Sequence, residues 1–207
     1  MVTLAVLETR HFTVNNFVYK IVKVFYHKYN KKGVLTKKEE NTMSCIEKIL
    51  ARRSIRTFKD QPIDQEIINK ILEAGRVAPS ATNSQPWHFV VVKDSKGKDA
   101  CDFQGFNQWV NGASFVVVGF YRQSEAIIEK LSLMDVTIAL QNMVIAGWVQ
   151  GVGSCWMGAF NEKKLKKTLN LPSDSEVVGA IAFGITKNVP RQPPKKPLNE
   201  IFHFDKW

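Results

Sequence analysis

Hydrophobic residues follow helical spacing in some stretches of the chain and form short continuous runs in others. Helical spacing predicts one helix from Met43 to Arg53 and a second that opens at Asp64, its expected N-cap, and ends before Pro79. The continuous apolar runs predict four buried strands, at residues 88–93, 114–120, 154–157 and 176–185. Because helices and strands alternate, the pattern indicates a mixed α/β or α+β domain.

Three more helices are expected between these strands: a short one at residues 98–110, a long one at 131–150, and a basic one capped by Asn161 that runs to Leu169. The long helix is apolar on most sides, and such a helix must be covered on all sides. In a domain this small, a second subunit is the natural cover, so we expect a homodimer. The proline-rich tail from Asn188 is expected to be extended, because proline cannot continue a helix.

Residues 1–42 differ in composition from the rest. They hold eight Lys/Arg against three Asp/Glu, whereas residues 43–207 hold 21 against 16, so each part carries half of the net charge of +10. One interpretation is an amphipathic basic arm. Another is that the native chain starts at Met43, because residues 38–43 back-translate into a purine-rich ribosome-binding sequence followed by ATG. We expect a domain over residues 43–207 in either case.

Composition argues against several classes of protein. Three cysteines and four histidines are scattered without a Cys-x-x-Cys pair, so no protein-bound metal is expected. The longest uncharged stretch, Val136 to Asn161, contains polar residues and glycines, so no membrane span is expected. Residues 1–20 do not resemble a signal peptide, which makes the cytoplasm the expected location. Without a nucleic-acid-binding module, the basic charge indicates a solvated surface suited to anionic small ligands rather than to nucleic acid.

The first segment with candidate chemistry is residues 52–56, in which three arginines and a serine lie within five positions: Arg52, Arg53, Ser54 and Arg56. Guanidinium groups offer a rigid fork of donors that suits phosphate, and a serine hydroxyl adds a shorter donor. Basic residues at the end of a helix are also favourable without any ligand. On its own, the segment therefore leaves a phosphate site and a simple helix end both open.

Two further segments are rich in small polar residues or glycine. The loop from Pro79 to Trp87 carries Asn83 and Gln85, whose amides donate and accept at once, as the edge of a planar heterocycle requires. An ordinary capped turn is the alternative. Residues 151–160 contain three glycines, which allow the backbone to approach a ring system closely. Cys155 in this segment is expected to be a small buried hydrophobic residue rather than a nucleophile.

Together, and in this order, the three segments resemble the compact branch of the nitroreductase family of FMN-dependent oxidoreductases. The resemblance covers Met43 to Trp207 and includes the long uncharged helix and the basic, proline-rich tail. It implies an α+β fold: a three-layer α/β/α sandwich with a mixed, mainly antiparallel central sheet. It also implies a homodimer with a long buried helix at the interface, and FMN bound where the two chains meet.

The resemblance also implies the residues that contact FMN. Arg52 and Ser54 match phosphate and ribityl contacts, with Arg53 beside them, and Arg56 matches a basic residue near flavin N1 and O2. In the loop that the second chain brings, the matching residues are Pro79, Ser80 and Asn83, with Gln85 alongside. Near flavin N5 they are Trp156, Met157 and Gly158, and in the basic tail Lys195 or Lys196. Asn107 is only a loose counterpart of an asparagine found in the middle of some relatives.

The activity that the resemblance implies is a ping-pong reaction. A hydride passes from NADH or NADPH to FMN and then to a small-molecule acceptor such as a nitroaromatic or a quinone, and no catalytic side chain is expected. One alternative is an FMN-binding storage or redox-sensing protein without efficient turnover. Another is a membrane- or nucleic-acid-associated protein led by residues 1–30. Within enzymes, dehalogenation, thiazoline oxidation and flavin breakdown also stay open.

Overall fold

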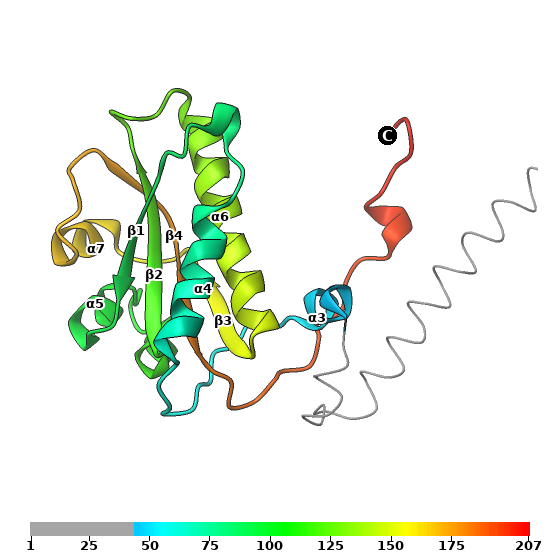
Figure 1. Cartoon of the computed structure of the whole chain (residues 1–207), viewed down its shortest axis with the longest axis horizontal. Helices are drawn as coiled ribbons and strands as arrows, with labels where there is room; N and C mark the ends of the chain where they lie inside the picture. The colour runs from blue at the N-terminus through cyan, green and yellow to red at the C-terminus, as the bar shows by residue number, and fades with distance from the viewer. Residues whose placement is uncertain (1–43) are drawn as a thin grey trace, which may run out of the picture. The chain divides into compact units, whose positions relative to one another are not determined.

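The computed structural model describes residues 44–207 (Figure 1). Residues 1–43 lie outside the described part, and with them the predictions of a basic arm and of a start at Met43. Residues up to Pro190 belong to one compact unit and Arg191–Trp207 to another. Each of these two parts is described by itself.

One four-stranded sheet forms the middle of the domain. Its strands are β1 (Trp87–Val92), β2 (Phe115–Arg122), β3 (Val152–Met157) and β4 (Ser175–Ile185), in the order β1-β2-β4-β3. Every neighbouring pair is antiparallel. The central strands β2 and β4 are the most deeply buried, as their continuous apolar runs predict. All four strands expected from the sequence are present.

Helices cover both faces of the sheet (Figure 1). On one face lie α4 (Gln65–Arg76) and α6 (Glu129–Val149), which enclose a core with residues of β2, β3 and β4. On the other face lie α5 (Ser95–Ala100) and α7 (Glu162–Thr168), around a second core. The structure is therefore a three-layer α/β/α sandwich with a mainly antiparallel sheet, and this prediction is confirmed.

Side-chain caps decide where the helices begin. Asp64 accepts a hydrogen bond from the backbone N–H of Glu66 at 2.8 Å and opens α4, and Asn161 opens α7 in the same way. Both caps were expected from the sequence. The first described helix, α3 (Cys45–Ala51), begins with a reciprocal capping box between Ser44 and Glu47.

The predicted helix at residues 98–110 is wrong. Helix α5 ends at Ala100, and a separate 3₁₀ helix follows at Gln108–Gly112. Between them the chain wraps around the carboxylate of Asp102, which accepts the backbone N–H groups of Gly105 at 2.9 Å and Asn107 at 2.6 Å. Gly105 has a φ of 86°, which a continuous helix cannot accommodate.

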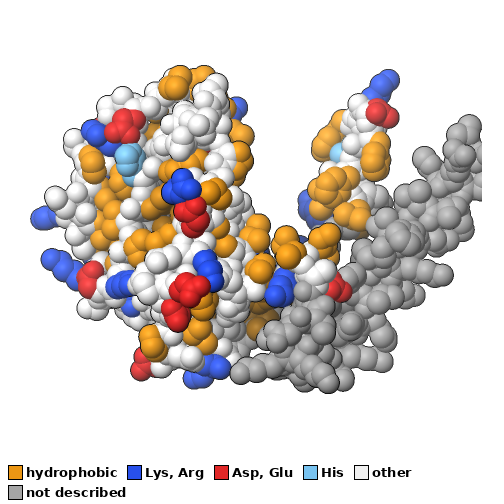
Figure 2. Space-filling view, in the orientation of Figure 1, with side chains coloured by type: hydrophobic (Ala, Val, Ile, Leu, Met, Phe, Trp, Pro, Cys, Tyr) orange, Lys and Arg blue, Asp and Glu red, His pale blue; other side chains and the backbone are white. Residues whose placement is uncertain are grey.

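The outer sides of α4 and α6 differ in character. Two ion pairs line the exposed side of α4, and in Figure 2 charged side chains lie over this helix. Helix α6 instead exposes large apolar side chains at Leu133, Met134 and Ile138. Helix α6 is long and apolar enough to cross a membrane, but the core helix of a soluble protein can have the same length and composition. Eight of its residues are buried in the domain, as expected of a core helix.

The tail forms no helix or strand from Arg191 to Pro197, consistent with its prolines, and Pro197 itself has an extended backbone. A single 3₁₀ turn, η3 (Leu198–Glu200), follows Pro197. The backbone N–H of Ile201 closes this turn on the carbonyl of Leu198 at 3.1 Å. The expectation of a fully extended tail is therefore wrong at these residues, which lie beyond the last proline.

Candidate functional site

The arginine segment, residues 52–56, lies along the free edge of β3. Helix α3 ends at Ala51, and Arg52 takes an extended conformation with a ψ of 136°. The backbone N–H of Ile55 donates to the carbonyl of Ser154 at 2.9 Å, and Ser54 pairs with Ser154 in a parallel bridge. Since Ile55 is fully buried, the segment is fixed in place and its polar side chains flank the strand edge.

The arginines of this segment have different surroundings. Arg53 donates from Nη1 to the carbonyls of Leu50 at 3.2 Å and Arg52 at 2.8 Å, so its charge stabilises the end of α3. Within residues 44–207, the guanidiniums of Arg52 and Arg56 make no hydrogen bond or ion pair. The guanidinium of Arg56 lies over the ring of Trp109, with Cζ 5.8 Å from the centroid. Arg52 and Arg56 are thus the cations open to an anionic ligand.

Three of the predicted residues influence the thiol of Cys155. Burial raises the pKa of its thiol, while the charge of Arg56, a hydrogen bond with Ser54 and the charge of Arg52 all act in the opposite direction. Because burial has the largest effect, the thiol stays neutral. Cys155 is therefore a buried side chain beside the cations, as the sequence predicts, and not an activated nucleophile.

The segment that follows, residues 156–158, directs its side chains differently from what a ligand contact requires. Met157 is buried among residues between the sheet and α7, and Trp156 packs on the opposite face, where its Nε1 donates to Gln141 Oε1 at 3.0 Å. A side chain built at Gly158 would meet nothing within 4 Å. The space at Gly158 is therefore open, while Trp156 and Met157 pack in the two cores; contacts of these three residues with a planar ligand stay a prediction.

The loop from Pro79 to Trp87 has an unusual backbone. Thr82, Asn83 and Gln85 all have positive φ angles, of 52°, 59° and 50°. Such conformations are costly for residues other than glycine and are enriched at functional sites. Ser80 Oγ accepts the backbone N–H of Gln85 at 3.0 Å and closes the loop.

Pro79, Asn83 and Gln85 are exposed. The amide of Asn83 makes no hydrogen bond within the described part of the chain, whereas that of Gln85 donates to the carbonyl of Asn83 at 3.2 Å. Asn83 therefore offers a complete donor and acceptor set to a ligand.

The carboxylate of Asp135, which the sequence analysis did not identify as a site residue, holds this loop. Asp135 of α6 is 5% exposed, and its two oxygens lie 3.1 and 3.3 Å from the backbone nitrogen of Ala81. An ionisable residue inside an otherwise apolar helix is the signal that could have identified it, because buried charges need partners. The loop is therefore attached to the N-terminal half of α6.

The helix that precedes the arginine segment, α3, is attached to the other end of α6. Lys48 of α3 donates from Nζ to the carbonyl of Val149 at 3.3 Å. Asp135 and Val149 are separated by about 21 Å along a helix that rises about 1.5 Å per residue. Within one chain, the loop and the arginine segment therefore lie far apart along α6.

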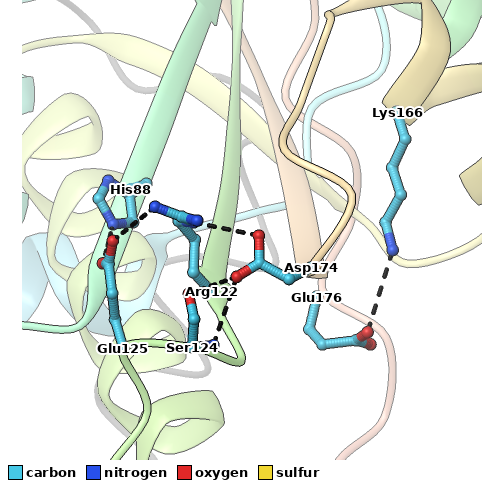
Figure 3. Close-up of polar contacts among 7 residues, drawn as sticks. All are labelled: His88, Arg122, Ser124, Glu125, Lys166, Asp174 and Glu176. Carbon is cyan, nitrogen blue, oxygen red and sulfur yellow. Dashed lines mark hydrogen bonds and ion pairs between the residues drawn. The ribbon is translucent and has the colours of Figure 1, made fainter.

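A network of charged residues closes the end of the sheet next to the loop (Figure 3). His88 Nε2 and Glu125 Oε2 are 2.6 Å apart, and Arg122 bridges Glu125 at 3.0 Å and Asp174 at 3.1 Å. Ser124 also donates to Asp174. These residues come from β1, from β2 and the turn after it, and from the residue before β4, so the network ties together three segments that lie far apart in the sequence.

The two predicted lysines of the tail remain to be placed. Lys195 and Lys196 are exposed and belong to the separately described tail, so their role remains a prediction. Across residues 44–207, no three His, Cys, Asp or Glu side chains come together in a way that could hold a metal ion.

A sequence model of the Nitroreductase family matches residues 49–104 and 102–185. A protein of Archaeoglobus fulgidus assigned as an NADH dehydrogenase/NAD(P)H nitroreductase is 33% identical over 150 residues, which cover 70% of this chain and 86% of that protein. The FMN reductase (NADPH) of Bacillus subtilis is 28% identical over 181 residues, which cover 77% of this chain and 73% of that protein. The chain belongs to the Nitroreductase family.

Solved structures agree. A protein of Desulfovibrio desulfuricans assigned as a nitroreductase, in complex with FMN, matches with a TM-score of 0.73 and 27% identity over 80% of this chain and 98% of that one. The NADPH:FMN oxidoreductase of Vibrio harveyi, complexed with NAD+, matches with a TM-score of 0.73 and 26% identity over 79% of this chain and 77% of that one. The predictions of the fold, the family and an NAD(P)H-dependent oxidoreductase are confirmed.

Proposed function

We propose that this protein binds FMN and transfers a hydride from NADH or NADPH, through the flavin, to a small acceptor such as a nitroaromatic or a quinone. The observation that carries the proposal is the edge of β3, where the bridge between Ser54 and Ser154 holds the arginine segment along the strand that ends next to the open backbone of Gly158. Relatives named for FMN and NADPH support the choice of cofactor and co-substrate.

The residues present fit FMN. The half-buried guanidinium of Arg52 has no partner within residues 44–207 and suits a phosphate, with the hydroxyl of Ser54 as a second donor. Arg56 supplies a second unpaired cation, which suits the pyrimidine edge of a flavin. Gly158 leaves room for a ring system against the backbone. Of the residues in this segment that the sequence predicts to contact FMN, Arg53 is the least suited, because its guanidinium already donates to the carbonyls of Leu50 and Arg52.

FMN supplies the hydride chemistry when it is bound. The protein's own residues bind and orient it and adjust its charge: Arg52 and Ser54 hold the phosphate end, and Arg56 places a positive charge where negative charge develops on reduction. No side chain acts as a proton donor or acceptor in this scheme, and Cys155 stays a neutral thiol.

A second copy of the chain completes the site. The loop from Pro79 to Gln85 contacts α6 at Asp135, and the helix before the arginine segment contacts it at Val149, about 21 Å further along the axis, so we infer that one chain does not bring both to one ligand. Helix α6 exposes Leu133, Met134 and Ile138, which a partner helix can cover. Antiparallel pairing of α6 in a homodimer would place the loop of one chain, with Asn83, near Arg52 and Arg56 of its partner.

The visible spectrum of the purified protein tests this proposal. We expect a yellow protein with flavin absorption bands that NADH or NADPH bleaches without air and that a quinone restores. A colourless protein that FMN does not reconstitute contradicts it. Flavin bands that neither nicotinamide bleaches would favour the alternative of a storage or redox-sensing protein.

One kinetic measurement and one measurement of oligomeric state test the proposal further. The ping-pong order predicts parallel lines when reciprocal rate is plotted against reciprocal NAD(P)H at several acceptor concentrations, and intersecting lines contradict it. Sedimentation should give a dimer, whereas a monomer that retains FMN contradicts the shared site.

A further inference from the structure

One side of α6 carries an apolar stripe with an amide in its middle. Met134 and Ile138 are exposed and Ile145 and Trp148 are half-buried, and Gln141 lies between the two pairs. These residues follow one another at alternating steps of four and three, so they lie on one side of the helix. The same spacing allows two long helices to pack along each other, so the stripe suits a second copy of α6.

The amide of Gln141 is hydrogen-bonded at one end. Its Oε1 accepts a hydrogen bond from Nε1 of Trp156 at 3.0 Å, whereas its Nε2 makes no hydrogen bond within residues 44–207. Because an indole nitrogen only donates, this contact decides which end of the amide faces Trp156. An unsatisfied polar group is costly once it is buried. When a second copy covers the stripe, Nε2 therefore needs an acceptor from that copy.

The two attachment points on α6 select one register for antiparallel helices. The loop after α4 is attached at Asp135, and α3 is attached at Val149. With the two-fold axis at Gln141, Asp135 of one chain lies about 3 Å along the axis from the level of Val149 of the partner subunit, at about 1.5 Å per residue. An axis at Ile138 or at Ile145 leaves about 12 Å or about 9 Å instead. The axis at Gln141 therefore brings the loop and the arginine segment closest to one level.

We propose that Gln141 sets the register of a homodimer built on α6, by hydrogen bonds between the two copies of its amide across the two-fold axis. Each Nε2 donates to Oε1 of the partner subunit's Gln141, which has a second lone pair besides the one that Trp156 occupies. A single polar residue in an apolar helix seam selects one register, because other alignments bury it unpaired. The inference rests on the proposed function, because it needs a site that two chains share.

The same side chain connects the helix to the strand beside the proposed flavin. Trp156 lies on β3, two residues before Gly158, and accepts no freedom at its ring: a Cβ at Gly179 of β4 would lie 2.9 Å from it. Gln141 holds the indole nitrogen of this ring from α6. One residue therefore contributes both to the register of the dimer and to the position of β3, and its loss should weaken FMN binding while the dimer persists.

Disulfide trapping in the FMN-loaded dimer tests the register with the amide in place. All variants carry Cys45→Ser, which removes the exposed cysteine. The double variant Met134→Cys/Trp148→Cys should form a cross-linked dimer on mild oxidation, because each new thiol lies level with the other one in the partner subunit. Ile138→Cys and Ile145→Cys report the two neighbouring registers. They should not cross-link, because each lies about 9 Å or about 12 Å along the axis from its own copy.

Gln141→Leu tests the role of the amide. The variant keeps a side chain of similar size, so sedimentation should still give a dimer that dissociates no more readily than the wild type. Without the amide other registers become accessible, and we expect the Kd for FMN to rise about tenfold. Adding Ile138→Cys to this variant should now produce a cross-link. Ile145→Leu, an apolar exchange in the same stripe, is the matched control and should keep the wild-type Kd.

The outcomes separate this inference from the proposed function. A wild-type protein that is monomeric or holds no FMN contradicts the proposed function and the inference with it. An FMN-loaded dimer in which the Met134→Cys/Trp148→Cys pair does not cross-link contradicts the inference alone. A Gln141→Leu dimer with the wild-type Kd for FMN contradicts it too, and so does one that dissociates and loses FMN together, which would indicate a merely structural role.

Discussion

The backbone N–H of Ala81 points at the buried carboxylate of Asp135, with N–O distances of 3.1 and 3.3 Å. This contact joins the strained loop, in which three residues have positive φ angles, to the N-terminal half of α6. The other end of α6 accepts a hydrogen bond from Lys48 of α3, the helix that precedes the arginine segment. Its length therefore sets the distance between the two parts of the site.

Replacing Asp135 tests this anchor. Asp135→Ala leaves the N–H of Ala81 without its partner, and we expect a loss of about 1–3 kcal/mol in the free energy of unfolding together with weaker FMN binding. Asp135→Asn keeps an acceptor oxygen and should lose less. Urea unfolding and fluorescence titration with FMN measure the two effects. Thr137→Ala on the same helix is the control, and an Asp135→Ala protein as stable as that control contradicts the prediction.

Arg52→Ala tests the phosphate contact. Removal of a charged hydrogen bond should cost about 1–3 kcal/mol of binding free energy, which corresponds to a rise of about 5- to 150-fold in the Kd for FMN. Equilibrium dialysis of the apoprotein measures it. Arg76→Ala, which removes an exposed arginine of α4 paired with Glu73, is the control. An unchanged Kd in Arg52→Ala would remove this residue from the site.

Gly153 tests the fit of the arginine segment on β3. A Cβ at this position would meet Thr186 Oγ1 first and would lie 2.9 Å from Ile55 Cγ1, so Gly153→Ala displaces Thr186 and presses on the arginine segment at Ile55. We expect a loss of about 1–3 kcal/mol in unfolding free energy and a higher Kd for FMN. Gly112→Ala is the matched control, because its new Cβ would find its nearest neighbour at 4.0 Å. Equal stability and equal FMN affinity of the two variants would refute this packing.

The network at the end of the sheet predicts a pH dependence. Hydrogen bonds from Ser124 and Arg122 lower the pKa of Asp174 from its ordinary 3.8 to about 2. A carboxyl whose pKa is lower in the folded state stabilises the fold fully above its ordinary pKa, and this contribution disappears as the pH falls through about 2. The difference in Tm between wild type and Asp174→Asn should therefore be largest near pH 5 and shrink towards pH 2.

Thermal unfolding at several pH values between about 5 and 2 measures this difference. Asp60→Asn serves as the control, since Asp60 is exposed and makes no ion pair within residues 44–207. A Tm difference between Asp174→Asn and wild type that stays constant over this range would contradict the prediction.

Local signals predicted most of the elements correctly. Asp64 and Asn161 are helix caps because their side chains bond to backbone N–H groups two or three residues away, which neighbouring sequence can specify. The helix predicted at residues 98–110 was wrong because neighbouring sequence does not show all the contacts that shape this segment. In the turn after α5, the carboxylate of Asp102 accepts the backbone N–H groups of Gly105 and Asn107, and Asn107 also donates to the carbonyl of Ala159, more than fifty residues away.

The sequence by itself determined the chemistry available to this protein: the apolar runs that must be buried, the cations of residues 52–56 and the amides of the loop at 79–87. Only the tertiary structure decided how they are used. It paired Arg53 with the end of α3, left Arg52 and Arg56 beside Cys155, and brought Asp135 to Ala81. These outcomes depend on contacts between residues far apart in the chain, where burial and hydrogen-bond geometry select one arrangement that local spacing cannot specify.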